Sequence, residues 1–111
     1  MHIKRHFRVN WQQGVFNHER ILPEGWVKQS ISPASSEKQG YGFQIWLNTG
    51  SDTTVRRYPA APADLFCADG FESQLIFVIP SKNLVIVRLG LTQHNNFNAN
   101  DFLHDVLGSF K

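Results

Sequence analysis

The chain has a single cysteine, Cys67, and it has no long apolar run. One thiol excludes an intrachain disulfide framework, and it fits a reducing compartment as well as a disulfide-free exported protein. No run of apolar residues approaches the roughly 20 needed for a transmembrane helix. The charged N-terminus is not followed by an apolar signal segment. The sequence therefore predicts no membrane partner and leaves the compartment unknown.

Charge is also scarce, because only 18% of the residues are charged and the net charge is +2. The small basic excess lies mainly in residues 1–8, without the helix-face spread and interleaved aromatics that nucleic-acid binding uses. The histidines form no His-Glu-x-x-His motif and no Cys/His cluster; they are His2, His6, His18, His94 and His104. We therefore expect no nucleic-acid partner, no metal site and no cofactor.

The length and composition indicate one globular domain spanning residues 1–111. Apolar residues make up 41% of the 111-residue chain and aromatic residues 13%, as in ordinary globular proteins. A domain of this size removes roughly 65% of its unfolded surface from water, so a modest core is expected.

Two apolar runs, residues 75–79 and 84–89, are the strongest structural signal. The four residues between them are too few for the crossover of a dozen or more residues that a parallel pair needs, so the runs predict an antiparallel hairpin. Both runs are apolar at nearly every position, which indicates strands covered on both faces.

The remaining elements are predicted from local patterns. We expect an irregular helix over residues 1–13, a short helix around Pro23–Val27, a strand over 41–47 and a long irregular excursion over 48–64. Asn98 or Asn100 can cap a C-terminal helix. Its apolar stripe consists of Phe102, Leu103, Val106, Leu107 and Phe110.

Together these elements predict an α+β fold. It has an antiparallel sheet of about three strands, a C-terminal helix that covers one face of the sheet, and one or two short N-terminal helices. The second face of the sheet has no evident cover within the chain.

Five segments, taken in order, resemble the C-terminal part of class C β-lactamase-like serine hydrolases, particularly the 6-aminohexanoate-dimer hydrolases and related esterases. The resemblance runs from about residue 14 to the C-terminus and corresponds to only the final part of a whole family member. The segments are 14–17 (GVFN), 20–27 (RILPEGWV), 41–46 (YGFQIW), 68–74 (ADGFESQ) and 79–90 (IPSKNLVIVRLG).

The resemblance implies a partial β-lactamase-like fold and an acyl-enzyme chemistry for the whole family member. Such chemistry needs a nucleophilic serine with a base and preset donors for the oxyanion. Only the family's third motif falls in this chain, as Gly70, Phe71, Glu72, Ser73 and Gln74, and Ser73 stands where glycine is usual. By the same resemblance, the aromatic side chains of Tyr41 and Trp46 would line or support the substrate cleft.

Two short motifs match the family's other signatures by chance. Ser35 and Lys38 have the Ser-x-x-Lys spacing of the nucleophile, yet they lie in a polar Ser/Pro loop rather than at the start of a helix. Ser81 and Asn83 spell Ser-x-Asn, but a hairpin turn is reason enough for polar residues there.

Three functions remain open at this level. In the first, the chain is the C-terminal fragment of a serine hydrolase that hydrolyses amides or esters, and it is inactive without its missing catalytic half. In the second, it is a non-catalytic binding or assembly module that associates through its exposed sheet face, for example as a homo-oligomer. In the third, Glu72, Ser73 and the loop over residues 48–64 bind a ligand in a remnant of the hydrolase cleft. The substrate or ligand is open in all three.

Overall fold

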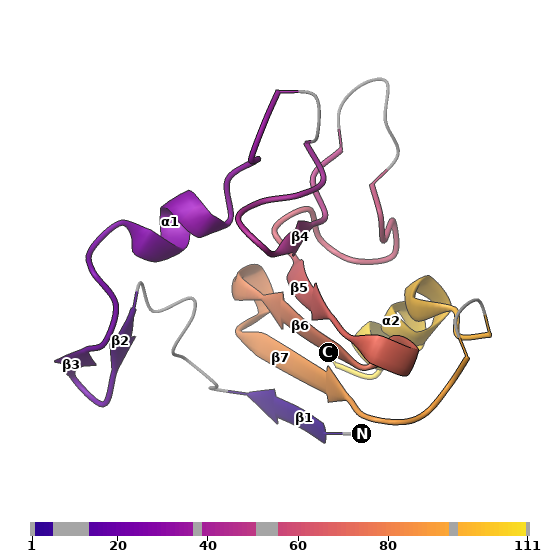
Figure 1. The fold of residues 1–111 in the computed structure, drawn as a ribbon. Helices are drawn as coiled ribbons and strands as arrows, with labels where there is room; N and C mark the ends of the chain where they lie inside the picture. Colours follow the sequence, from indigo (N-terminus) through magenta and orange to yellow (C-terminus); the bar gives the residue numbers. More distant parts are fainter. Residues whose placement is uncertain (1, 6–13, 37–38, 51–55, 94–95, 111) are drawn as a thin grey trace.

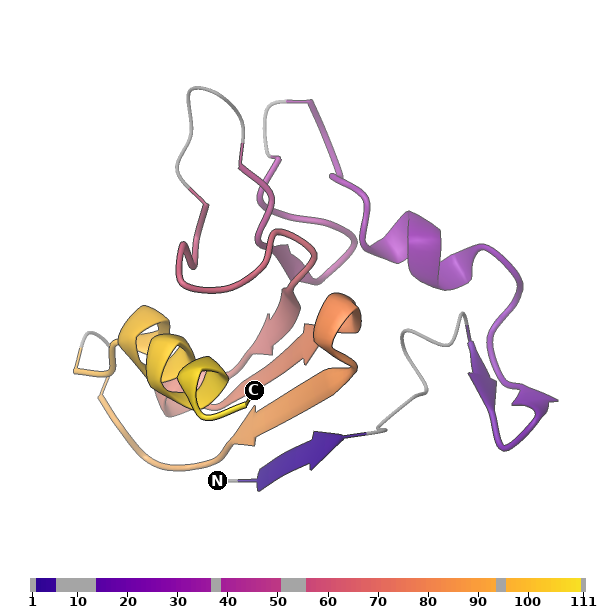
Figure 2. The same cartoon turned by 180° about the vertical axis from the view of Figure 1, so that it is seen from behind.

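In a computed structural model, an antiparallel sheet carries the C-terminal helix across one face (Figures 1 and 2). The structure describes residues 2–5, 14–36, 39–50, 56–93 and 96–110. The sheet has five strands in the order β1-β7-β6-β5-β4, and a separate two-stranded sheet pairs β2 with β3. The predicted α+β class is confirmed.

The strongest sequence signal, the hairpin, is confirmed. Strands β6 (Leu75–Ile79) and β7 (Leu84–Arg88) pair antiparallel, with Leu75 opposite Arg88 and Ile79 opposite Leu84. A 3-10 turn, η2 (Pro80–Lys82), joins them, and Asn83 closes it in the left-handed region at φ 50°.

The C-terminal helix is also confirmed, as α2 (Ala99–Gly108). The side-chain oxygen of Asn98 accepts a hydrogen bond from the backbone N–H of Asp101, so Asn98 is the N-cap. The predicted stripe faces the sheet: Leu103 and Val106 are buried against it, while Phe102, Leu107 and Phe110 pack at the margin.

The predicted number of strands is wrong, because two further strands join the three expected. Residues 66–69 form β5 (Phe66–Asp69), and β1 (His2–Arg5) pairs with β7 at one edge of the sheet. The expected irregular helix over 1–13 is therefore wrong at residues 2–5, and residues 6–13 lie outside the described part. Tertiary pairing with an apolar neighbour overrides a segment's weak local pattern here.

The predicted strand over 41–47 is shorter than expected. Only β4 (Trp46–Leu47) is a strand, and Tyr41 pairs back onto Trp46 through an isolated bridge. Gln44 has φ 63°, so the chain reverses where the alternating pattern suggested an extended run. Gly42 permits this, because a Cβ there would lie 2.4 Å from the carbonyl oxygen of Ser30.

The N-terminal region forms small elements at the side of the sheet (Figure 1). Strands β2 (Val15–Phe16) and β3 (Glu19–Arg20) make a tight hairpin, and α1 (Trp26–Ser30) follows. Asn17 and His18 both have positive φ, which is typical of a two-residue hairpin turn. The short predicted helix is present, but it begins three residues later than Pro23.

Both faces of the sheet carry core residues. On the α2 side, Phe77, Ile79 and Ile86 are buried beneath Leu103. On the other face, Leu47, Phe66, Val78 and Val85 are buried, with Ile31 and Ile45 packed against them. The second face is thus partly covered from within the chain, in contrast to the prediction, although Ile76 stays 44% exposed on β6.

Candidate functional site

The candidate site is an open cleft of about 480 Å³ between the end of β5, the turn before β6 and the start of α2. This volume lies within the range of small-molecule sites. The lining combines charged, amide and hydroxyl groups with three apolar side chains: Arg57, Tyr58, Asp69, Ser73, Leu75, Phe97, Asn98, Ala99 and Asn100.

The predicted third motif forms the turn that borders this cleft. Gly70 donates its N–H to the carbonyl of Gln74 at 2.8 Å, which closes residues 70–74 around the 3-10 turn η1 (Phe71–Ser73). Ser73 lines the cleft, whereas Gly70, Glu72 and Gln74 shape the turn without appearing in the lining. Of the four candidate residues predicted from the sequence, Gly70, Glu72, Ser73 and Gln74, one, Ser73, lies in the lining of this cleft.

Two consecutive residues of this turn have left-handed backbones. Glu72 has φ 59° and Ser73 has φ 63°, and neither is glycine. A left-handed conformation costs an L-residue about 1–2 kcal/mol, so the surrounding contacts must hold these two in place. Positive φ is the backbone region that favours glycine, and at position 73 a serine adopts it.

An ion pair between Arg57 and Asp69 forms one wall of the cleft, and two aromatic rings lie behind it. Arg57 Nη2 lies 3.1 Å from Asp69 Oδ2, and Arg57 Nε donates to the Tyr58 hydroxyl at 2.9 Å. The guanidinium carbon lies 4.4 Å from the centroid of the Trp46 ring, a cation–π distance. Tyr41 meets Trp46 edge to face at 4.7 Å. Tyr41 and Trp46 thus support Arg57 from behind and are not themselves in the lining.

Asn48 holds the segment that carries Arg57 and Tyr58. Its Nδ2 donates to the carbonyl oxygens of Tyr58 at 2.9 Å and Pro62 at 2.9 Å, and its Oδ1 accepts from the backbone N–H of Tyr58 at 2.6 Å. Within the predicted excursion 48–64, Asn48 thus holds Tyr58 and Pro62 in place beside the cleft. Residues 51–55 lie outside the described part.

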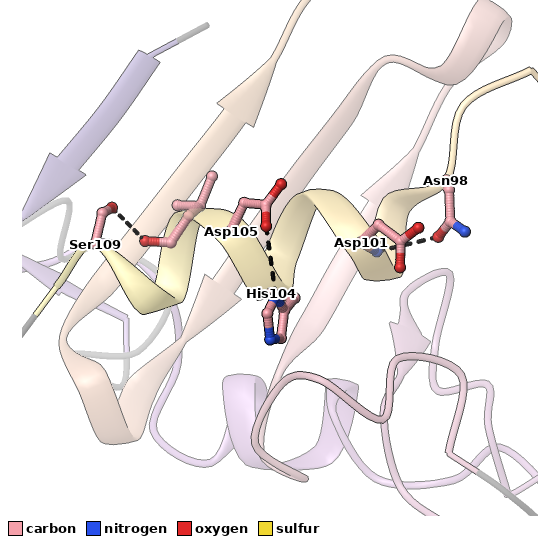
Figure 3. Close-up of polar contacts among 6 residues, drawn as sticks. Asn98, Asp101, His104, Asp105 and Ser109 are labelled. Atoms are coloured by element: carbon pink, nitrogen blue, oxygen red, sulfur yellow. Dashed lines mark hydrogen bonds and ion pairs between the residues drawn. The ribbon is translucent and has the colours of Figure 1, made fainter.

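Two asparagines at the start of α2 offer amide donors to the cleft. The Oδ1 of Asn98 accepts from Asp101 N–H at 3.0 Å, and the Oδ1 of Asn100 accepts from Ala60 N–H at 2.9 Å. These bonds assign the orientation of both amides, so their NH₂ groups remain as donors. In Figure 3 the Asn98 nitrogen lies on the side away from the helix. With Arg57, these donors suit a ligand that presents carbonyl or carboxylate oxygens.

The other titratable and hydroxyl groups considered from the sequence have structural roles. Ser81 donates its hydroxyl to the Asp64 carboxylate at 2.9 Å, which fixes the β6–β7 turn. His104 and Asp105 form an exposed pair at 3.4 Å, and the Ser109 hydroxyl donates to the Val106 carbonyl (Figure 3). Ser35 is exposed, and Lys38 lies outside the described residues.

The described ranges hold neither a metal-binding cluster of side chains nor a membrane-spanning helix. Among residues 2–5, 14–36, 39–50, 56–93 and 96–110, no group of three His, Cys, Asp or Glu side chains is placed to hold a metal ion. Within those same ranges, no helix has the length and apolarity needed to cross a membrane.

Sequence reasoning missed Arg57, Tyr58 and Asp69. Nothing in the local sequence indicates that Asn48 returns the loop carrying Arg57 and Tyr58 to the sheet. A comparison with protein-family models and a search of characterised proteins found no match to the chain.

The buried thiol of Cys67, next to Arg57 and Tyr58, makes the stability of the protein depend on pH. Burial raises the pKa of Cys67 to about 11 from an ordinary value of 9.0, and burial also raises the pKa of Tyr58. Between pH 9 and 11 the unfolded thiol loses its proton while the folded one keeps it. The contribution of Cys67 to the free energy of unfolding is therefore fully present below pH 9. As the pH rises further, this free energy falls by about 2–3 kcal/mol.

Urea unfolding of the wild type and Cys67→Ala at pH 8, 9, 10 and 11 measures this loss. The free energy of unfolding should fall more steeply with pH in the wild type than in the variant. Equal slopes would show that Cys67 does not contribute.

Proposed function

We propose that this chain is the sheet-and-helix part of a β-lactamase-like serine hydrolase and forms one wall of its substrate cleft. The observation that carries the proposal is the turn at residues 70–74, where the family-like motif borders a cleft of small-molecule size and contributes Ser73 to its lining. The antiparallel sheet with a C-terminal helix on one face is consistent with the fold that the resemblance implies.

The substrate would be an ester or amide whose acyl oxygens meet the donors of this wall. Arg57 and the amide groups of Asn98 and Asn100 are among its donors, and Leu75 and Phe97 provide apolar contact for the rest of the acyl group. Such an amphipathic lining with a few convergent polar groups is typical of small-molecule sites.

The chain alone should not catalyse the reaction. A serine becomes a nucleophile only with an adjacent base, and the described lining of the cleft contains no lysine and no histidine beside Ser73. The nucleophile and its base would then come from a catalytic half outside these 111 residues.

Covalent probes test the absence of a nucleophile. The folded protein is incubated with a fluorophosphonate and, separately, with a penicillin, and its intact mass is measured beside an active serine hydrolase. We expect an unchanged mass for this chain and an adduct on the active enzyme. A stoichiometric adduct that disappears in Ser73→Ala would overturn the inactivity and make Ser73 the nucleophile.

Substrate binding is the second arm of the same test. N-methylhexanamide, an acyl compound that the chain should not cleave, is titrated while backbone amide signals are followed by NMR. We expect saturable shifts at Ser73, Asn98 and Asn100 with a dissociation constant on the order of millimolar. Asn98→Asp keeps the helix cap but replaces a donor by a carboxylate, so it should weaken binding at least about fivefold. Asn96→Asp, which makes the same change outside the lining, should not. If Asn98→Asp and Asn96→Asp bind N-methylhexanamide equally well, the proposed substrate contact at this wall of the cleft is refuted.

Assembly is the second candidate function, and one surface favours it. Phe71, in the turn, is 79% exposed, and Ile76, Leu89 and Leu91 are also exposed at this end of the strands. Apolar clusters of this kind mark association sites. Light scattering on the NMR sample decides between the candidates: a concentration-dependent dimer without N-methylhexanamide binding would favour assembly.

A further inference from the structure

Arg88 lies at the meeting point of the motif turn and the segment that leads to α2. It is the last residue of β7 and pairs across the sheet with Leu75, the first residue after the turn. Its backbone is therefore fixed by the sheet, while its side chain is half-buried and reaches beyond the strand. A rigid base of this kind allows the guanidinium group to act as an anchor.

The guanidinium group bonds the two left-handed residues through their carbonyl oxygens. Arg88 Nη1 donates to the carbonyl of Ser73 at 2.7 Å and lies 3.5 Å from the carbonyl of Glu72. Its Nη2 donates to the Thr92 hydroxyl, and the Thr92 N–H donates to the Glu72 carbonyl at 3.2 Å. Both carbonyls of the disfavoured pair thus accept hydrogen bonds that either Arg88 or its partner supplies.

The same group also touches the opposite part of the cleft lining. The guanidinium carbon of Arg88 lies 4.0 Å from the centroid of the Phe97 ring. Phe97 lines the cleft next to the Asn98 cap, and its ring packs on Phe102 of α2 at 5.5 Å. One side chain therefore contacts the turn that carries Ser73 and the ring that precedes α2.

We propose that Arg88 is a positioning residue that holds Glu72 and Ser73 in their left-handed conformations and fixes the distance between Ser73 and Phe97. A planar guanidinium group suits this role, because its several N–H donors can bond acceptors in two directions while its face packs on an aromatic ring. The ammonium group of a lysine is a compact charge without a planar face, so it cannot bond the carbonyls and pack on the ring at the same time. The conformational claim stands on these contacts alone, and only its consequence for a substrate rests on the function proposed above.

Removing the guanidinium should change the turn and leave the core intact. In Arg88→Ala, we expect the backbone NMR signals and the HN–Hα couplings of Glu72 and Ser73 to move away from left-handed values. Signals of Phe77 and Leu103 in the core should stay near their wild-type positions. Arg56→Ala is the matched control, since Arg56 donates to the carbonyl of Pro59 and is not in the lining.

Chemical rescue separates positioning from general stability. Guanidinium ions at millimolar concentration should return the Glu72 and Ser73 signals of Arg88→Ala toward the wild type, whereas methylammonium at the same concentration should not. If Arg88→Ala does not fold, Arg88→Lys serves instead, and it should shift the same two residues. Left-handed couplings that persist at Glu72 and Ser73 in the folded variant would overturn the proposal. So would equal rescue by both ions.

Discussion

Replacing Asn48 by aspartate is expected to lower the free energy of unfolding by about 3–5 kcal/mol, although the two side chains have the same shape. Asn48 is 0% exposed and is the only buried polar side chain of the described core. Its NH₂ group faces the carbonyl oxygens of Tyr58, Ala61 and Pro62. An aspartate would turn an oxygen toward all three, so the protein would have to bury either a charge or a lone-pair repulsion.

Urea denaturation of the purified variant measures this loss. Asn96→Asp makes the same chemical change at an exposed position and should alter the free energy by less than about 0.5 kcal/mol. As urea is added to the variant, the NMR signals of residues 56–65 should broaden or shift at lower concentration than those of α2, because Asn48 holds that segment. A loss in Asn48→Asp as small as in the control would contradict the role assigned to Asn48.

Truncating Phe77 to alanine should cost about 3–5 kcal/mol, through lost transfer energy and the cavity left behind. Phe77 is 0% exposed on β6, a strand flanked by β5 and β7. Its ring meets Tyr58 edge to face at 5.5 Å and lies 6.5 Å from Phe102 of α2. The side chain therefore joins the sheet, the helix and the segment beside the cleft.

The matched control is Phe71→Ala, the same substitution at a ring that is 79% exposed. It should change the free energy of unfolding by no more than about 0.5 kcal/mol. Phe77→Leu refills most of the space and should cost less than the alanine variant. Similar losses for Phe77→Ala and Phe71→Ala would show that the packing at Phe77 does not support the fold.

The elements that the sequence predicted well are those whose information is local. The linker at 80–83 permits only an antiparallel return, and the stripe from Phe102 to Phe110 repeats at helical spacing behind the Asn98 cap. Neither conclusion needs knowledge of a distant residue. Hence the hairpin, the helix and the α+β class were predictable.

The remaining strands and most of the cleft depend on distant partners. Strand β1 is a strand because β7 offers an unpaired edge, and β5 is one because β6 does. Arg57 reaches the cleft because Asn48 returns a polar loop, and Asp69 is recognised only once it faces Arg57. None of these pairings leaves a periodic signal in its own segment.

The pairing of β1 with β7 has a consequence for the order of folding. Strands β5, β6 and β7 are consecutive and α2 follows closely, whereas Arg5 meets Leu84 across most of the chain. Closing a long loop costs more entropy than closing a short one, so the consecutive part should assemble first and β1 should dock last. Until it docks, β7 is an open, strongly apolar edge that can pair with the same strand of another molecule. The pairing of β1 with β7, which forms last, is therefore the one that covers the edge of β7 and protects the chain from aggregation during refolding.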